Sequence, residues 1–191
     1  MNAATADPLA VAVRVADVLE SLGITYSIGG SLAGSFAGEP RATLDIDMVV
    51  DLDEPHVAAM VRALEGEFYI DELALRRAVR DRTTTNLIHH ATSIKVDLFV
   101  AGGTALDADL LRRRIRVGER SGGSLWIHSV EDIPLQKLRW FQRGGHASDR
   151  QWRDVLSIVR VQGDRLDRHY LEEGAARLHV ADLLDRVLVG R

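Results

Sequence analysis

The stretch Arg41-Ala42-Thr43-Leu44-Asp45-Ile46-Asp47-Met48-Val49-Val50 places two carboxylates inside a segment with the pattern of a strand. Residues i and i+2 of a strand project from the same face, so Asp45 and Asp47 stand side by side while Ile46 points into the core. Adjacent carboxylates repel, and a shared divalent cation keeps both ionised. The alternative is a strand edge that faces solvent. We favour the metal, because aspartate is disfavoured in strands and Met48-Val49-Val50 has the pattern of a buried run.

A glycine turn precedes this stretch. Gly29-Gly30-Ser31 follows a short strand predicted over residues 24–28 and opens a helix predicted to run to about residue 36. Glycines let the backbone approach a ligand, and a helix N-terminus offers free N–H groups to a phosphate. The serine hydroxyl adds a donor. A strand–glycine–helix turn is also a common structural joint, so this motif alone leaves both interpretations open.

A third carboxylate lies in the apolar stretch of residues 94–100. Val96, Leu98 and Val100 form one face of this predicted strand, and Asp97 lies on the other face beside Phe99. Asp97 is either a paired acid of the core or a third carboxylate that strand pairing brings next to the first two.

The remaining pattern predicts an α+β protein with a mixed sheet flanked by helices and followed by a helical region. We assign residues 1–128 to the α/β core and residues 129–191 to the helical region. Helices are predicted over residues 8–22, 55–64, 71–80, 131–143, 147–161, 167–178 and 180–188, and further strands over 86–90, 93–100, 114–117 and 124–128.

Composition excludes several classes of protein. The 191 residues include no cysteine, which rules out disulfide scaffolds, thiolate metal sites and cysteine nucleophiles. No apolar run approaches the roughly 20 residues of a membrane span, and residues 1–10 lack the features of a signal peptide. We therefore expect a cytoplasmic protein without a membrane partner.

The charges are distributed unevenly along the chain. Residues 1–70 carry a net charge of −8 and residues 112–150 a net charge of +5. This asymmetry suits a site that holds cations on one side and polyanions on the other, although chance alone also produces such drift. Of the 24 basic residues only Lys95 and Lys137 are lysines, so a lysine is notable wherever it occurs.

Taken together, these motifs resemble the nucleotidyltransferase superfamily that includes polymerase beta. The form Gly-Gly-Ser…Arg-x-Thr-x-Asp-Ile-Asp is most similar to abortive-infection type nucleotidyltransferase toxins and their uncharacterised small bacterial relatives. Glu131-Asp132, Lys137-Leu138-Arg139 and the segment 148–155 also resemble the helical half of that group. The resemblance implies a nucleotidyltransferase fold.

The resemblance also implies roles for individual residues. Asp45 and Asp47 would hold two Mg²⁺ ions, for which Mn²⁺ can substitute, and Asp97 would bind the metal nearer the attacking hydroxyl and help to deprotonate it. The implied nucleotide-binding residues, which would contact the phosphates of a nucleoside triphosphate, are Gly29, Gly30, Ser31, Arg41 and Lys137. For Arg41 the alternative is to brace its own loop.

Transfer of a nucleoside monophosphate from a nucleoside triphosphate to a hydroxyl is the activity that follows. The resemblance to toxins favours RNA, including tRNA ends, as acceptor and a cognate antitoxin as partner, and the basic segment 112–150 supports RNA. A small antibiotic of the aminoglycoside or lincosamide type is the alternative, favoured if Asp71, Glu72 and Asp81 line the site. A second alternative is a module that binds a nucleotide or a partner without catalysis. The enzyme hypothesis fails if Asp97 points into the core while Asp45 and Asp47 face solvent.

Overall fold

A computed structural model describes residues 7–118 and 123–189, which fall into two units. The first, here called the sheet unit, extends to residue 32 and resumes over residues 42–127. The second, here called the helical unit, comprises residues 33–41 and 128–191. The helix α2 (Gly30–Ala37) begins in the sheet unit and ends in the helical unit.

Seven strands of the described residues form one mixed sheet in the order β3-β4-β5-β2-β1-β7-β6. The pairs β2–β5 and β1–β7 are parallel and the others are antiparallel. The strands are β1 (Tyr26–Ile28), β2 (Asp45–Val50), β3 (Phe68–Ile70), β4 (Thr84–His89), β5 (Lys95–Val100), β6 (Ile115–Val117) and β7 (Leu125–Ile127).

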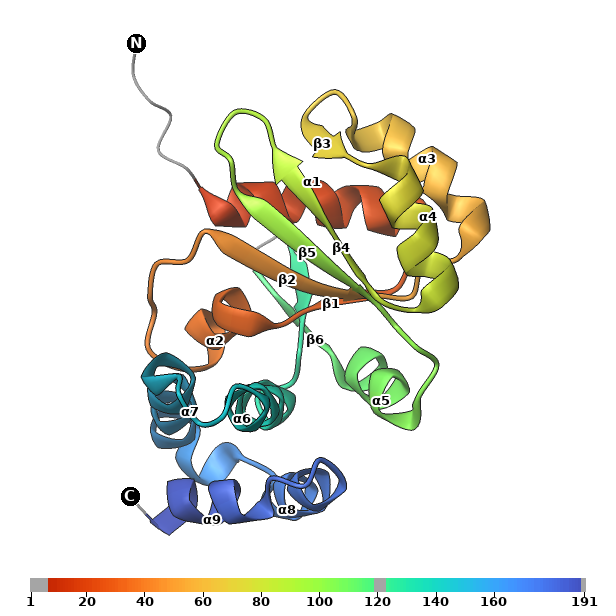
Figure 1. Ribbon diagram of the computed structural model, residues 1–191. Coiled ribbons are helices and arrows are strands. Elements are labelled where there is room, and N and C mark those ends of the chain that lie inside the picture. Colours follow the sequence, from red (N-terminus) through yellow and green to blue (C-terminus); the bar gives the residue numbers. More distant parts are fainter. Residues whose placement is uncertain (1–6, 119–122, 190–191) are drawn as a thin grey trace. The chain divides into compact units, whose positions relative to one another are not determined.

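Helices cover the apolar side of this sheet. Helices α1 (Pro8–Ser21), α3 (Glu54–Leu64) and α4 (Glu72–Asp81) pack together beside it, and α5 (Ala105–Arg113) follows β5 (Figure 1). Capping residues fix the start of α1. The Asp7 carboxylate accepts a hydrogen bond from the N–H of Leu9 at 2.9 Å, and Pro8 occupies the first turn. Strict alternation of buried and accessible residues along β2 and β5 directs one face of each strand into this core.

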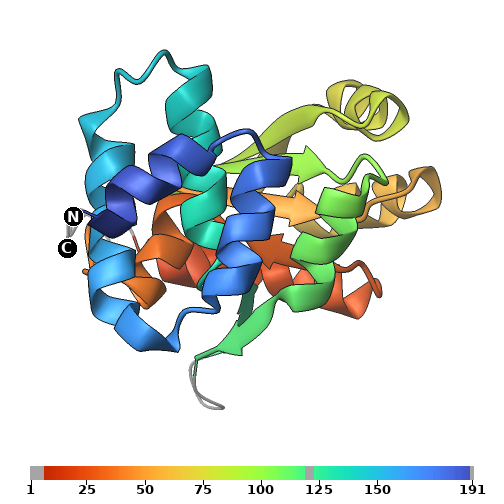
Figure 2. The ribbon, with the colours of Figure 1, turned by 90° about the horizontal axis from the view of Figure 1, so that it is seen from below.

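The helical unit is built from α6 (Asp132–Arg143), α7 (Asp149–Gln162), α8 (Arg168–Arg177) and α9 (Ala181–Val189), with a short 3₁₀ turn at Gly163–Arg165. Figure 2 shows these helices, coloured teal to dark blue, gathered in one bundle. Their shared core consists of buried aliphatic and aromatic side chains from all four helices, including Leu138, Val155, Leu171 and Leu184. Residues 33–41 join this unit through hydrogen bonds from Glu39 N–H to Ser157 Oγ and from Gln162 Nε2 to the carbonyl of Ala37.

The predicted fold class, a mixed sheet with flanking helices and a C-terminal helical region, is confirmed. The helices and strands predicted above are present, with ends displaced by at most two residues. Strand β3 and helix α5 were not predicted. No helix within residues 7–118 and 123–189 combines the length and the apolar character that a membrane crossing needs.

Candidate active site

The three predicted carboxylates lie on one face of the sheet. Asp45 and Asp47 alternate with buried residues along β2, as Asp97 does along β5. The two strands are parallel neighbours, and their register pairs Asp47 directly with Asp97. Residues opposite each other in register project from the same face. Asp97 therefore lies on the accessible face with the other two carboxylates, and the condition that would have defeated the enzyme hypothesis is not met.

Lys95 belongs to the same group and was not predicted as a site residue. It lies two residues before Asp97 on β5 and opposite Asp45 in the register. Its Nζ is 2.9 Å from Asp97 Oδ2. This hydrogen bond raises the pKa of Lys95, burial opposes the rise, and the charges of Asp97, Asp45 and Asp47 add to it. The ammonium group thus lies within electrostatic reach of all three carboxylates.

The glycine turn is joined to the second aspartate. The N–H of Gly29 donates to the carbonyl of Asp47 at 2.8 Å, which continues the β1–β2 pairing by one residue. Gly30 has φ +58°, and a Cβ at this position would lie 1.8 Å from Asp47 Oδ2. Ser31 follows it in the first turn of α2. The turn therefore needs glycine at position 30 both for its backbone and for the space that the Asp47 carboxylate occupies.

The donor set suits Mg²⁺ in kind, since magnesium prefers hard carboxylate oxygens. Asp47 and Asp97 are cross-strand neighbours, and Asp45 shares their face. Within the part of the chain that the structure describes, no three Asp, Glu or His side chains are gathered as a ready-made metal site. At Asp97 the cation in contact is the Lys95 ammonium. The carboxylates fit the metal chemically, and the Asp97 carboxylate is already paired with Lys95.

The two remaining predicted residues, Arg41 and Lys137, meet in the helical unit. Lys137 Nζ donates to Asp154 Oδ2 at 2.7 Å and to Gln151 Oε1 at 3.3 Å. Arg41 binds the same carboxylate through Nη2 at 3.0 Å and Nε at 3.1 Å. Lys137 is only 3% exposed, and a Cβ added at Gly34 would lie 3.3 Å from its Cε. A lysine from α6, an aspartate from α7 and an arginine from residues 33–41 thus form one cluster.

Asp154 is ionised in this cluster. Burial raises the pKa of its carboxyl, but the hydrogen bonds and charges of Arg41 and Lys137 outweigh burial and lower the pKa below its usual value. The sequence did not predict that these three side chains come together, because Arg41 and Asp154 are 113 residues apart.

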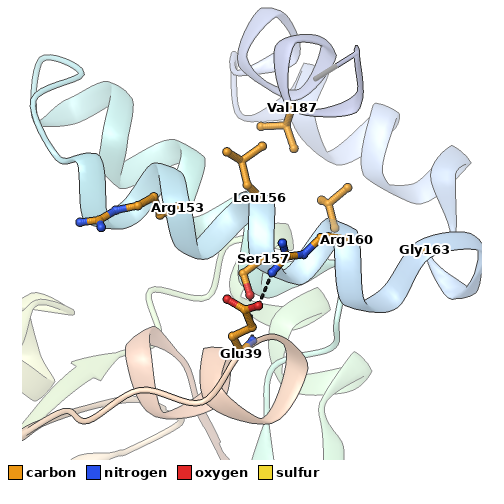
Figure 3. Close-up of a pocket in the computed structure, with 8 residues that line it drawn as sticks. Glu39, Arg153, Leu156, Ser157, Arg160, Gly163 and Val187 are labelled. Carbon is orange, nitrogen blue, oxygen red and sulfur yellow. Dashed lines mark hydrogen bonds and ion pairs between the residues drawn. The ribbon is translucent and has the colours of Figure 1, made fainter. Parts of the chain in front are cut away.

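A cavity of about 630 Å³ lies elsewhere in the helical unit. Figure 3 shows Ser157 and Arg160 from α7 close to Glu39, which forms an ion pair with Arg160. None of the predicted site residues lines this cavity. Its lining residues are Glu39, Arg153, Leu156, Ser157, Val159, Arg160, Gly163 and Val187.

The acidic residues considered for a cationic acceptor have local partners. Asp71 caps α4 by accepting from the backbone N–H three residues on, at 2.9 Å. Glu72 pairs with Arg76 one turn away at 2.6 Å, and Asp81 pairs with Arg80 at 2.9 Å. These three carboxylates therefore interact mainly with groups of α4 itself.

The arginines considered for RNA binding are also engaged locally. Arg112 pairs with Asp109 at 2.5 Å. The guanidinium of Arg114 lies 4.6 Å from the ring centroid of Trp126, and that of Arg116 lies 5.7 Å from it. These cation–π contacts give the basic segment a structural role in β6 and β7.

Comparison with known proteins supports the fold. No family model and no curated protein matches the sequence. Among solved structures, an antigenic nucleotidyltransferase-like protein from Paracoccidioides brasiliensis is 19% identical, with a TM-score of 0.56 over 95% of this chain and 93% of that one. A nucleotidyltransferase proposed in Thermotoga maritima is 17% identical, with a TM-score of 0.50 over 76% of this chain and 92% of its own.

The antibiotic-resistance factor ANT(2″)-Ia is similar over nearly its whole length. It is 15% identical, with a TM-score of 0.57 over 93% of this chain and 95% of that one. A crystal structure shows ANT(2″)-Ia in complex with adenylyl-2″-tobramycin. These likenesses show that the chain has the nucleotidyltransferase fold that its motifs predict.

Proposed function

We propose that this protein transfers a nucleoside monophosphate from a nucleoside triphosphate to a hydroxyl group. The observation that carries this proposal is the grouping of three carboxylates, Asp45, Asp47 and Asp97, on one sheet face, with the Asp47 carboxylate in the space beside Gly30 that a Cβ would fill. A carboxylate face next to a glycine turn at a helix start can hold both a cation and a phosphate chain.

The chain's own residues divide the work of the reaction. Two bound Mg²⁺ ions, or Mn²⁺ in their place, would stabilise the attacking and leaving oxygens of an in-line displacement at the α-phosphate. Asp45 and Asp47 would hold these ions, and Asp97 would accept the proton of the acceptor hydroxyl. The N–H groups of Gly30 and Ser31 at the start of α2 would bind the β- and γ-phosphates, which leave as pyrophosphate.

The proposed roles of Arg41 and Lys137 at the phosphates need a further step. Both side chains bind Asp154 in the structure, and Lys137 is buried. A contact of Lys137 with a phosphate would require it to exchange the carboxylate of Asp154 for the nucleotide. Arg41 fits the alternative of bracing its own loop, because its main-chain N–H and carbonyl also bond to Ser35 Oγ.

For the acceptor we propose a small hydroxylated molecule, with RNA as the second candidate. The likeness to ANT(2″)-Ia extends over nearly the whole of both chains, which favours an acceptor of the size of an aminoglycoside. The ion pair of Arg112 with Asp109 and the contacts of Arg114 and Arg116 with the Trp126 ring weaken the charge argument for RNA. The equivalent pairing in α4 also weakens a charge argument for a cationic antibiotic. A cognate antitoxin remains a prediction from the resemblance, and a purely binding function remains the second alternative.

Incorporation of label tests the transfer. The protein would be incubated with Mg²⁺ and each α-labelled nucleoside triphosphate, alone, with an aminoglycoside or lincosamide panel, and with total RNA. We expect label to enter an acceptor and pyrophosphate to be released. Asp47→Asn should lower the rate on the order of a hundredfold or more, as loss of one electrostatic group at a reacting centre does. Asp51→Asn serves as matched control, because Asp51 is exposed and directly follows β2.

The outcomes separate the alternatives. Label in a small molecule confirms the proposed acceptor class, and label in RNA moves the assignment to the second candidate. Nucleotide binding without transfer to any acceptor would favour a binding module. Equal rates for wild type and Asp47→Asn would refute the assignment of the carboxylate face.

A further inference from the structure

We propose that Lys95 is the counterion of Asp97 in the resting protein and competes with the divalent cation for this carboxylate. The inference rests on the proposed function and concerns how that site is loaded. Lys95 would therefore set the metal affinity of the site, and Asp97 would become available to a metal when Lys95 releases it.

The geometry of β5 places the two groups together. Lys95 and Asp97 are two residues apart, so both side chains project from the same face, and their charged groups are 2.9 Å apart. Lys95 is also opposite Asp45 in the β2–β5 register, and Asp97 is opposite Asp47. The Lys95 ammonium thus lies among the three carboxylates and is attracted by each of them.

The solvent exposure of the Lys95–Asp97 pair allows a divalent cation to replace the ammonium. The Lys95 side chain is 42% exposed and that of Asp97 is 22% exposed. A partly solvated ion pair is held weakly, because water screens its charges and solvates them when they separate. A lysine carries a point charge on a flexible four-carbon stem, so the ammonium can turn to solvent without any movement of β5. A divalent cation offers Asp97 twice the charge at a similar distance.

The ion pair also bears on the repulsion among the three carboxylates. The three carboxylates share a face, but within residues 7–118 and 123–189 they do not form a ready-made metal group. An ammonium bound to Asp97 neutralises one charge and relieves the repulsion that would otherwise oppose three carboxylates on one face. A salt bridge that only stabilises β5 would leave the metal affinity unchanged, and this difference can be measured.

Binding of Mn²⁺ to the full chain, followed by electron paramagnetic resonance of the free ion, tests the proposal without any turnover. Lys95→Met should tighten Mn²⁺ binding roughly threefold or more, the effect of removing one competing charge from a partly exposed pair. Lys95→Arg retains the charge and should bind as wild type does. Arg80→Met is the matched control, since it removes one positive charge from an exposed residue paired with Asp81 on α4.

The Asp97→Asn variant tests whether Lys95 affects Mn²⁺ binding through Asp97. Because Lys95 acts through Asp97, the gain from Lys95→Met should largely disappear when Asp97→Asn is present. Lys95→Gln, which is also uncharged, gives the same comparison if Lys95→Met does not fold.

Two negative results have different meanings. Mn²⁺ binding that requires Asp47 but is equal in wild type, Lys95→Met and Lys95→Gln would overturn the competition and leave the proposed function standing. Absence of Mn²⁺ binding in wild type and in all variants would overturn the metal site itself, and the proposed function with it.

Discussion

Asp47 can occupy its position because residue 30 has no side chain. A Cβ at Gly30 would lie 1.8 Å from Asp47 Oδ2 and 2.7 Å from its Cγ, so the carboxylate fills the space that any other residue would need. The φ of +58° adds a conformational cost for all residues with a Cβ. Gly30 therefore determines both the path of the turn and the direction of one of the proposed metal ligands.

Gly30→Ala should consequently disturb the site more than its backbone alone explains. We expect a loss of stability above the roughly 1–2 kcal/mol of an alanine at positive φ, and Mn²⁺ binding weakened at least tenfold because Asp47 must move. Urea unfolding and Mn²⁺ titration measure the two effects. Gly23→Ala is the control, because Gly23 has φ +70° with no atom within 4 Å of its Cβ position. Equal effects of the two substitutions would show that the contact with Asp47 is unimportant.

The sequence predicted which strand face each of the three aspartates occupies, but it did not predict which residues lie opposite them. The two-residue period of a strand was enough to place Asp45, Asp47 and Asp97 on polar faces. That Asp97 lies opposite Asp47 depends on the β2–β5 register, which no local pattern encodes. Lys95 was missed for this reason, although its spacing from Asp97 and the rarity of lysine in this chain were both visible.

Helices α6 and α7 are joined by a buried ion pair. Lys137 of α6 is 4% exposed at its side chain and Asp154 of α7 is 15% exposed, with their charged atoms 2.7 Å apart. Removal of Asp154 would take the carboxylate away from the buried Lys137 ammonium, whereas removal of Lys137 leaves Asp154 paired with Arg41. The pair therefore specifies how the two helices pack, independently of any contact with a nucleotide.

A double-mutant cycle tests this structural role. Asp154→Leu should cost about 3 kcal/mol, and the double variant Lys137→Met/Asp154→Leu should cost clearly less than the sum of the single changes. Urea unfolding of the four proteins gives the coupling energy. The exposed pair Arg80–Asp81 supplies the comparison, for which we expect no measurable coupling. Additive effects at Lys137 and Asp154 would show that the ion pair adds little to stability, which would favour a role of Lys137 at the nucleotide.

The sequence analysis did not predict one short strand, β3, and one helix with little hydrophobic periodicity, α5. Strand β3 spans three residues, Phe68–Ile70, too few to show alternation. Helix α5 buries only Leu110 and Leu111 among its nine residues, which leaves little periodicity. Its start was nevertheless encoded, because Thr104 and Asp107 form a reciprocal capping box.

Over the whole molecule, the predicted domain ranges and the observed units differ at residues 33–41 and at residue 128. Residues 33–41 belong with the helical unit because Glu39 N–H donates to Ser157 Oγ, 118 residues away, and Arg41 binds Asp154. Contacts between residues so distant in the chain depend on tertiary packing, which hydrophobic periodicity does not report. The nucleotidyltransferase fold itself was predictable because its motifs are local.

His128, the first residue of the helical unit after β7, makes stability depend on pH. It is 3% exposed, and burial lowers its pKa to about 4 from an ordinary 6.5. The unfolded chain therefore binds a proton that the folded chain does not, and stability present above pH 6.5 is lost as the pH falls towards 4. A difference of this size corresponds to about 3 kcal/mol.

His128→Gln should flatten this dependence, because glutamine does not titrate. We expect the unfolding free energy of wild type to fall relative to this variant between pH 6.5 and 4.5, as measured by urea unfolding at a series of pH values. His169→Gln is the control, since the His169 side chain is 82% exposed and should leave the wild-type profile unchanged. Parallel profiles for wild type and His128→Gln would mean that the pKa of His128 is the same in the folded and the unfolded chain, and that its surroundings accommodate a positive charge.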